Sequence, residues 1–115
     1  MKPLHHPTVD AVTVEGILHA LSDPVRVQIL KEILRSSSPK SCSEFVSLPD
    51  RVIPKSTLSQ HFRILREAGL IRSERQGVFM RNTPRCQELQ PRFGRLIGAI
   101  LAAYTEQYKK TEEEA

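Results

Sequence analysis

Residues 54–70 read Pro-Lys-Ser-Thr-Leu-Ser-Gln-His-Phe-Arg-Ile-Leu-Arg-Glu-Ala-Gly-Leu, and this segment carries the clearest structural pattern of the chain. Leu58, Phe62 and Leu65 recur at spacings of four and three, which places them on one face of a helix. The other face carries hydroxyl, amide and guanidinium groups, which hydrogen-bond base edges and phosphates in a DNA major groove. Ser56 is the expected N-cap, and Gly69 is the expected left-handed residue after the helix. An ordinary amphipathic helix has the same stripe, so this segment alone does not establish DNA binding.

The distribution of charge points to the same segment. The 115-residue chain has a net charge of +4 and is long enough for one domain. Residues 51–85 hold eight basic and two acidic side chains, a net charge of +6, and the rest of the chain carries −2. A basic block centred on one helix is typical of a DNA-binding protein, although a solvated basic surface is the alternative.

Several classes of protein are not expected. The sequence has neither an apolar run of about 20 residues, as a membrane span needs, nor a signal-peptide pattern, so we expect a cytoplasmic protein without membrane partners. Cys42 and Cys86 form neither a disulfide framework nor a metal motif, and the default is two free thiols.

The chain before residue 54 is expected to be mostly helical. Residues 1–8 are predicted to be a flexible arm, and apolar spacing predicts a first helix over about 9–21. Asp23 and Pro24 can start a second helix, which runs to about Arg35. A capping box at 41–44 predicts a short third helix of about two turns. Together with the turn over 49–54 and the helix after it, this gives the helix-turn-helix order.

After Gly69 the apolar period changes from helical to two. Two short strands around Gln76 and Gly77 predict a cationic hairpin, which beside a helix-turn-helix is a wing able to reach the minor groove or the DNA backbone. A last helix is expected to begin between Cys86 and Pro91, because proline is tolerated in the first turn of a helix. Its apolar face is broad for so small a domain, which favours a dimer interface over packing on its own core.

The sequence therefore predicts a mainly α fold with a small β-hairpin, a winged helix-turn-helix of about five helices and a two-stranded wing. We expect an arm at 1–8, a DNA-binding and dimerisation domain at 9–110 and an acidic tail at 111–115. The predicted dimer-interface residues are Val12, Ile17, Phe93, Leu96, Ile97, Ile100, Leu101, Tyr104 and Tyr108.

Three segments together resemble the ArsR/SmtB family of winged-helix repressors. Residues 20–30, Ala-Leu-Ser-Asp-Pro-Val-Arg-Val-Gln-Ile-Leu, are similar to the family's L-S-D/N-x-x-R-x-x-I-L segment. Residues 56–71 resemble its recognition helix, S-x-H-L-x-x-L-x-x-A-G-L-V, and residues 75–77 with the strand that follows resemble its wing. The resemblance, which covers roughly residues 12–108, implies a homodimeric repressor that binds a palindromic operator in double-stranded DNA.

Carried over position by position, the resemblance implies two groups of DNA contacts. The recognition helix would supply Lys55, Ser56, Thr57, Ser59, Gln60, His61 and Arg63, and the wing would supply Arg75, Gln76 and Arg81. Ser59 and His61 hold the family's Ser-x-His positions, where we expect phosphate contact and positioning of the helix more than base reading. His61 as a metal ligand is disfavoured, because no second ligand lies at helical spacing.

The sequence departs from the metal-sensing members of that family. Where they carry Cys-x-Cys, this chain has Ser41, Cys42 and Ser43, and its last helix has no histidine. We therefore expect no metal and no cofactor, although His5 and His6 joining Cys42 or Glu106 of a partner chain is an alternative. Cys42 and Cys86 as a redox switch is a further alternative to two inert thiols, since Cys42 would lie at a helix N-terminus.

Two other classes of function compete with the repressor. A winged-helix protein-interaction module would use the same fold, but the basic block over 51–85 disfavours it. An enzyme is not expected, because no Ser/His/Asp set, glycine-rich phosphate loop or pair of catalytic carboxylates is present. The sequence leaves open the effector, the regulated genes and whether the protein represses or activates them.

Overall fold

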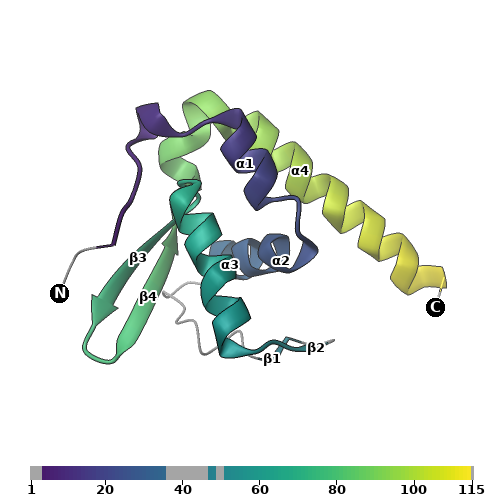
Figure 1. The fold of residues 1–115 in the computed structure, drawn as a ribbon. Helices are drawn as coiled ribbons and strands as arrows, with labels where there is room; N and C mark the ends of the chain where they lie inside the picture. Colours follow the sequence, from purple (N-terminus) through teal and green to yellow (C-terminus); the bar gives the residue numbers. More distant parts are fainter. Residues whose placement is uncertain (1–3, 36–46, 49–50, 115) are drawn as a thin grey trace.

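The computed structural model describes residues 4–35, 47–48 and 51–114 (Figure 1). A short 3-10 turn, Val9–Ala11, precedes four α-helices and two two-stranded antiparallel sheets within these ranges. The elements are α1 (Val14–Ala20), α2 (Pro24–Arg35), β1 (Ser47–Leu48), β2 (Arg51–Val52), α3 (Lys55–Glu67), β3 (Ile71–Gln76), β4 (Phe79–Pro84) and α4 (Cys86–Glu114). The expected mainly α fold with a β-hairpin wing is confirmed.

The apolar stripe of α3 forms the centre of the core. Leu58, Phe62 and Leu65 are all at most 2% exposed, as their spacing predicted. They belong to one cluster with apolar side chains of α1, α2 and the first half of α4. In Figure 1, α3 crosses in front of α2, the hairpin lies to one side, and α4 runs behind α1 toward the C-terminus. The outer face of α3 and the wing are therefore left open on the same side of the molecule.

The predicted start of the second helix is confirmed. Pro24 is the first residue of α2, and Asp23 Oδ1 accepts from the amide of Val25 at 2.7 Å. The first helix is shorter than the predicted 9–21, because Thr13 interrupts it with an extended backbone. The Thr13 hydroxyl accepts from the amide of Gly16 and caps the N-terminus of α1.

The C-terminal end of α3 is as predicted, whereas its N-cap is not. Gly69 has a φ of +89°, and a Cβ there would lie 2.5 Å from Cγ2 of Val12, so both conformation and space require glycine. The N-cap prediction for Ser56 is wrong, because the helix begins one residue earlier at Lys55. Pro54 takes the N-cap position instead and makes no side-chain hydrogen bond to the helix.

The hairpin has the predicted place and turn. Residues pair from Ile71 with Pro84 to Gln76 with Phe79, and Gly77 takes a φ of +60° in the two-residue turn. Ser73 Oγ donates to Asn82 Oδ1 at 2.7 Å across the buried face. This bond gives two polar side chains inside the sheet a partner, and it joins residues that lie opposite each other in the pairing of β3 with β4.

The predicted short helix after Ser41 falls mainly on residues 36–46, which lie outside the described residues. Where it would end, Ser47 and Leu48 form strand β1, which pairs with Arg51 and Val52 of β2. A helix that continued through Leu48 is therefore wrong, because backbone pairing with β2 requires an extended chain.

The N-terminal segment is not a free arm over residues 4–8. Pro7 is buried, and its carbonyl accepts from Nη1 of Arg85 at 2.8 Å. Nε2 of His6 accepts from the amide of Ser73 at 2.9 Å. Arg92 also donates to the carbonyl of Val9 at 3.0 Å. These contacts hold the segment against the base of the wing and the start of α4.

Helix α4 begins at Cys86, inside the predicted interval. Pro91 is the sixth residue of the helix, so the expectation that proline lies in the first turn is wrong. The helix continues through Glu114 and includes most of the predicted acidic tail. Within the described ranges, no helix is both long and apolar enough to cross a membrane.

Candidate nucleic-acid interface

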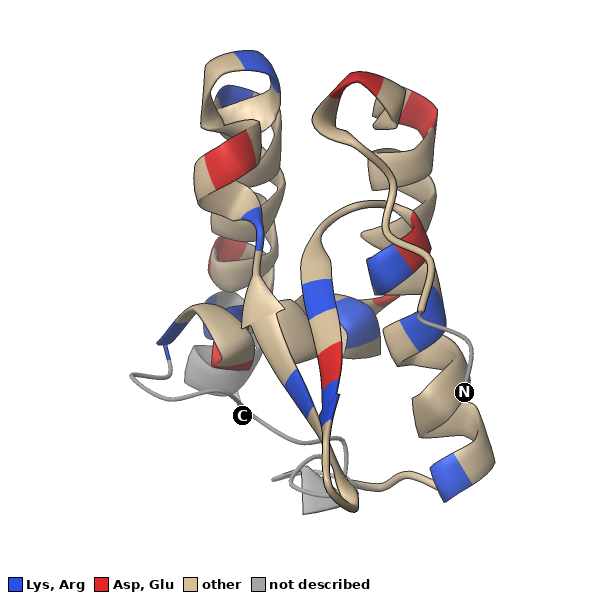
Figure 2. Ribbon diagram, turned by 90° about the vertical axis from the view of Figure 1, so that its left-hand side faces the viewer, with Lys and Arg blue, Asp and Glu red and all other residues tan. Residues whose placement is uncertain are grey.

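The outward face of α3 carries the polar side chains that the sequence singled out. Six of the seven predicted contacts on this helix are exposed: Lys55, Ser56, Thr57, Ser59, Gln60 and Arg63. The seventh, His61, is half-buried. Because the opposite face of α3 is fixed in the core, this polar face is held by a rigid element rather than by a loop. Figure 2 shows basic positions on α3 and on both strands of the wing.

The first amide groups of α3 have no hydrogen-bond partner within the helix. The amide of Leu58 bonds to the carbonyl of Pro54 at 2.9 Å, so the amides of Lys55, Ser56 and Thr57 precede the first intrahelical bond. Pro54 provides no side-chain cap for them. Amides at the positive end of a helix dipole bind phosphate oxygens well, and the Lys55 ammonium adds a full charge.

Arg63 is restrained within its own helix. Its Nε donates to Oε1 of Glu67 at 3.0 Å, and both side chains are more than half exposed. Such a pair is worth at most about 0.5 kcal/mol, so a phosphate or a base can replace the carboxylate.

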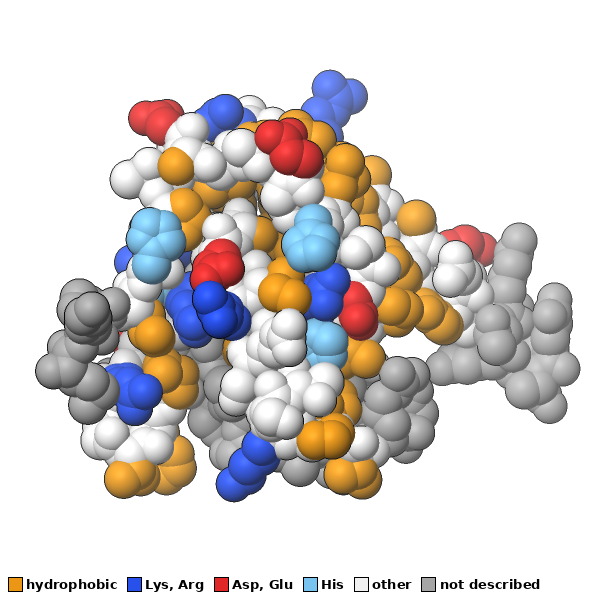
Figure 3. Space-filling view, viewed as in Figure 1, with side chains coloured by type: hydrophobic (Ala, Val, Ile, Leu, Met, Phe, Trp, Pro, Cys, Tyr) orange, Lys and Arg blue, Asp and Glu red, His pale blue; other side chains and the backbone are white. Residues whose placement is uncertain are grey.

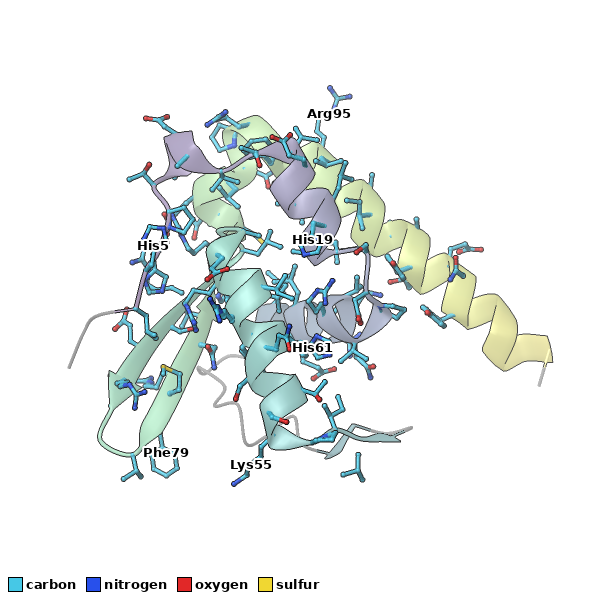
Figure 4. All side chains as sticks on the ribbon, viewed as in Figure 1. His5, His19, Lys55, His61, Phe79 and Arg95 are labelled. Carbon is cyan, nitrogen blue, oxygen red and sulfur yellow. The ribbon has the colours of Figure 1, made fainter. Side chains whose placement is uncertain are left out.

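The wing brings its three predicted contacts onto one hairpin. Arg75 and Gln76 are exposed at the end of β3, and Arg81 of β4 is half-buried. Nη1 of Arg81 donates to Oε1 of Gln76 at 2.7 Å. Figure 4 shows Phe79, beside the wing turn, and Lys55 pointing toward the same end of the molecule. The hairpin end and the start of α3 can therefore approach one ligand together.

Sequence reasoning missed the residue that supports α3 from behind. Arg26 of α2 is only 7% exposed. Its Nε donates to the carbonyl of Ala20 at 2.7 Å and its Nη2 to the carbonyl of His19 at 3.0 Å. Nη1 lies 3.4 Å from Nδ1 of His61 and 3.5 Å from Oδ2 of Asp23. The signal in the sequence was a charged residue inside an otherwise apolar helical stripe.

The surroundings of His61 favour its neutral form. A guanidinium only donates, so a hydrogen bond at this contact requires Nδ1 of His61 to accept and favours the neutral imidazole. Burial lowers the pKa of His61; Asp23 opposes this shift and Arg26 adds to it. His61 therefore links α3 to the buried guanidinium of α2, and its phosphate contact stays a prediction.

Part of the basic block is used inside the protein. Arg85 is 3% exposed and bonds to Pro7 and to Oε2 of Glu88, the latter at 3.3 Å. Arg72 pairs with Oε1 of the same carboxylate at 3.3 Å. Hydrogen bonding from Arg85 lowers the pKa of Glu88, so this carboxylate stays ionised at neutral pH. The net charge of +6 therefore overstates the cationic surface.

Neither the redox switch of Cys42 and Cys86 nor a metal site is supported by the described residues. Burial raises the pKa of the Cys86 thiol, which disfavours the reactive thiolate. Cys42 lies outside the described residues. Among the residues that the structure describes, no three His, Cys, Asp or Glu side chains form a set that could hold a metal ion. His6 is engaged with the wing through Ser73.

The predicted dimer-interface residues divide into two groups. Val12, Ile17, Phe93 and Ile97 are at most 6% exposed and pack in the core of the single chain, so their side chains are not available to a partner. They were assigned to the interface because the apolar face of a helix does not reveal which neighbour covers it. The remaining five are half-buried or exposed along α4: Leu96, Ile100, Leu101, Tyr104 and Tyr108.

Comparison with known proteins identifies the family. Residues 21–74 match the family model described as a helix-turn-helix domain. The chain is 32% identical over 63 residues to the uncharacterized HTH-type transcriptional regulator MJ1325 of Methanocaldococcus jannaschii, and the match spans 55% of this chain and 67% of that protein.

The solved structures that resemble this chain share its fold. An ArsR-like transcriptional regulator from Rhodococcus sp. RHA1 superposes with a TM-score of 0.56 at 24% identity, over 88% of this chain and 91% of the other. M. tuberculosis Rv0081 superposes with a TM-score of 0.58 at 24% identity, over 87% and 88% of the two chains. The chain therefore belongs to the DNA-binding helix-turn-helix transcriptional regulators and has an ArsR-type winged-helix fold.

Proposed function

We propose that the protein is a homodimeric repressor that binds a palindromic operator, with α3 of each protomer in a major groove. The observation that carries this proposal is the division of α3 into two faces. Leu58, Phe62 and Leu65 anchor it in the core, while six polar or basic side chains face outward. A helix held in this way presents its donors in a fixed geometry, as reading of base edges requires.

The exposed face of α3, the start of α3 and the wing would contact different parts of the DNA. Gln60 and Arg63 lie on the exposed face of α3 and can hydrogen-bond base edges, for which amide and guanidinium groups are well suited. Lys55 and the free amides at the start of the helix contact phosphates and fix its register. Arg75, Gln76 and Arg81 of the wing contact the flanking DNA backbone.

The dimer is supported by the apolar face that α4 leaves partly uncovered. Ile100, Leu101 and Tyr104 are half-buried by their own chain, and Tyr108 is 43% exposed. Val14 and Leu18 of α1, at 46% and 48% exposed, add apolar surface. A twofold axis through α4 would relate two copies of α3, whose half-sites would lie about one helical turn of DNA, or a multiple of it, apart.

Fluorescence anisotropy tests the proposal directly. The labelled duplexes are the DNA upstream of the protein's own gene and a scrambled duplex of equal composition, each titrated over a salt series. A specific regulator binds the upstream duplex about a thousandfold more tightly at physiological salt. Equal weak binding to both duplexes would contradict operator recognition. A reporter gene downstream of the same DNA distinguishes repression from activation.

A further inference from the structure

The N-terminal segment over residues 4–12, which we call the strap, runs along the open edge of β3. The hairpin has two strands, so among the described residues β3 has one edge without a neighbouring strand. Ser73 lies opposite Asn82 in the hairpin, but its amide donates at 2.9 Å to Nε2 of His6. Figure 1 shows the strap descending beside β3. An amide at a sheet edge is therefore bound by an imidazole instead of a further strand.

The rest of the strap is tied to the start of α4. The carbonyl of Pro7 accepts from Nη1 of Arg85 at 2.8 Å, and the carbonyl of Val9 accepts from Nη1 of Arg92 at 3.0 Å. The strap thus joins the start of α4 to β3, and His6 is the side chain through which it holds the wing.

The surroundings of His6 disfavour a positive charge on its imidazole. Burial lowers the pKa of His6, nearby arginines lower it further, and a hydrogen bond with the backbone of Leu4 opposes the shift. The charged groups around it are three arginines, from α3, β3 and the residue before α4, and a carboxylate of α4 that pairs with two of them: Arg66, Arg72, Arg85 and Glu88. His6 is therefore neutral at neutral pH and can accept from Ser73.

We propose that His6 is a positioning residue for the wing: its neutral imidazole fixes β3 in the orientation in which the wing meets DNA, and protonation releases it. The inference rests on the proposed operator binding and adds a residue that itself need not touch the DNA. Protonation places a donor opposite the Ser73 amide and a positive charge among three arginines. The strap then leaves β3, and Arg75 and Arg81 meet the DNA backbone from a less fixed position.

Anisotropy titrations of the upstream duplex at pH 7.5 and pH 5.5 test this role. His6→Ala has no acceptor and should bind about fivefold more weakly than wild type at pH 7.5, the effect of one hydrogen bond. His6→Gln keeps an acceptor that does not titrate. Its affinity should match wild type at pH 7.5 and exceed it about fivefold at pH 5.5. Equal pH profiles of His6→Gln and wild type, or a wild-type affinity above that of His6→Gln at pH 5.5, would overturn the inference.

His5→Gln is the matched control, because it removes a histidine from the same strap. Figure 3 shows a histidine side chain at the surface of the strap, and Figure 4 labels it His5 in the same view. Its pH profile should follow that of wild type. A profile like that of His6→Gln would assign the effect to the total charge of the strap and would overturn the role of His6.

A double-mutant cycle tests whether His6 acts through the wing. A variant with Arg75→Ala and Arg81→Ala lacks the proposed backbone contacts of the wing. Adding His6→Ala to it should weaken binding less than about twofold further, because the wing then has no contacts to position. The same loss from His6→Ala in both backgrounds would place its effect outside the wing and contradict the proposal.

Amide hydrogen exchange tests the bond without DNA. The protection factor of the Ser73 amide, measured by NMR at pH 7.5, should fall severalfold in His6→Ala but not in His6→Gln. The Leu65 amide in α3 should keep its protection in both variants, which excludes general unfolding. Unchanged protection of Ser73 in His6→Ala would contradict the bond.

The two levels of the proposal fail in different ways. Wild-type protein that does not distinguish upstream from scrambled DNA contradicts operator binding, and with it a positioning role in that binding. Wild-type protein that does distinguish them, while His6→Ala binds the upstream duplex equally well, contradicts the positioning role alone.

Discussion

The guanidinium of Arg26 on α2 lies 3.4 Å from Nδ1 of His61 on α3. The same guanidinium donates to the carbonyls of His19 and Ala20 at the end of α1, and it pairs with Asp23 before α2. One buried cation therefore joins α1, α2 and α3. The position of α3 therefore depends on a buried charge supplied by α2.

Replacement of Arg26 by methionine should destabilise the fold strongly. Arg26→Met removes the buried guanidinium that donates to the carbonyls of Ala20 and His19 and pairs with Asp23, and should lower the free energy of unfolding by about 2–4 kcal/mol. Urea denaturation followed by circular dichroism measures the change. Arg35→Met is the matched control, because the Arg35–Glu32 pair is exposed and is worth less than about 1 kcal/mol. Equal effects of the two variants would contradict the structural role of Arg26.

Stability should fall as the pH drops below 6.5. Burial, followed by nearby arginines, lowers the pKa of His6, and burial also lowers the pKa of His61. The folded chain therefore takes up protons less readily than the unfolded chain, in which both groups titrate near 6.5. Full stability is present above pH 6.5, and it declines as the pH moves from 6.5 toward the lowered pKa values.

Urea unfolding at pH 7.5 and pH 5.5 checks this dependence. The double variant His6→Gln with His61→Gln should lose most of the difference between the two pH values. His5→Gln, at an exposed position, should keep it. A double variant with the same pH difference as wild type would show that other groups are responsible.

Arg63→Ala should weaken operator binding by about 1–3 kcal/mol if its guanidinium reads a base. The loss should be much smaller on a scrambled duplex, because only the upstream DNA offers the correct base edge. Arg95→Ala is the control, since Arg95 lies at the opposite end of the molecule from Lys55 (Figure 4). Equal losses on both duplexes would assign Arg63 to a phosphate instead. Anisotropy titrations measure both affinities.

Glu67→Gln should increase DNA affinity two- to threefold at low salt. The substitution weakens the interaction of residue 67 with Arg63 and removes a negative charge from α3. One exposed charge changes the binding free energy by about 0.5 kcal/mol. The gain should disappear as salt is raised, because exposed charges are screened. Glu106→Gln, on α4, removes the same charge elsewhere and should have little effect. An unchanged or lower affinity for Glu67→Gln would indicate that Glu67 positions Arg63 productively.

Ile100→Glu should dissociate the proposed dimer and with it tight operator binding. Ile100 is half-buried within its own chain, so the charge would enter the surface that α4 offers to a partner. Sedimentation equilibrium should give the monomer mass of 13.0 kDa for this variant and twice that for wild type. Glu106→Lys changes a charge on the opposite side of the same helix and should leave the mass of the dimer unchanged. A wild-type protein that sediments as a monomer would contradict the dimer.

Features that depend on a few neighbouring residues could be predicted from the amino-acid sequence. The spacing of Leu58, Phe62 and Leu65 fixed the buried face of α3, and Asp23 with Pro24 fixed the start of α2. Gly69 and Gly77 stand at the end of α3 and in the wing turn, where the described backbone has a positive φ. Capping, periodicity and backbone sterics act over a few residues, so a sequence pattern reveals them.

Which surfaces are covered became clear from the packing of the folded chain. The apolar side chains of Phe93 and Ile97 looked like a dimer interface, but they pack in the core of their own chain. The segment with His6 and Pro7 looked free, but it is held by Ser73 and Arg85, more than 60 residues away. Arg26 had no role assigned from the sequence, and its partners come from α1, α3 and the residue before α2. Burial and partner choice depend on distant parts of the chain meeting in space, and no local pattern encodes that meeting.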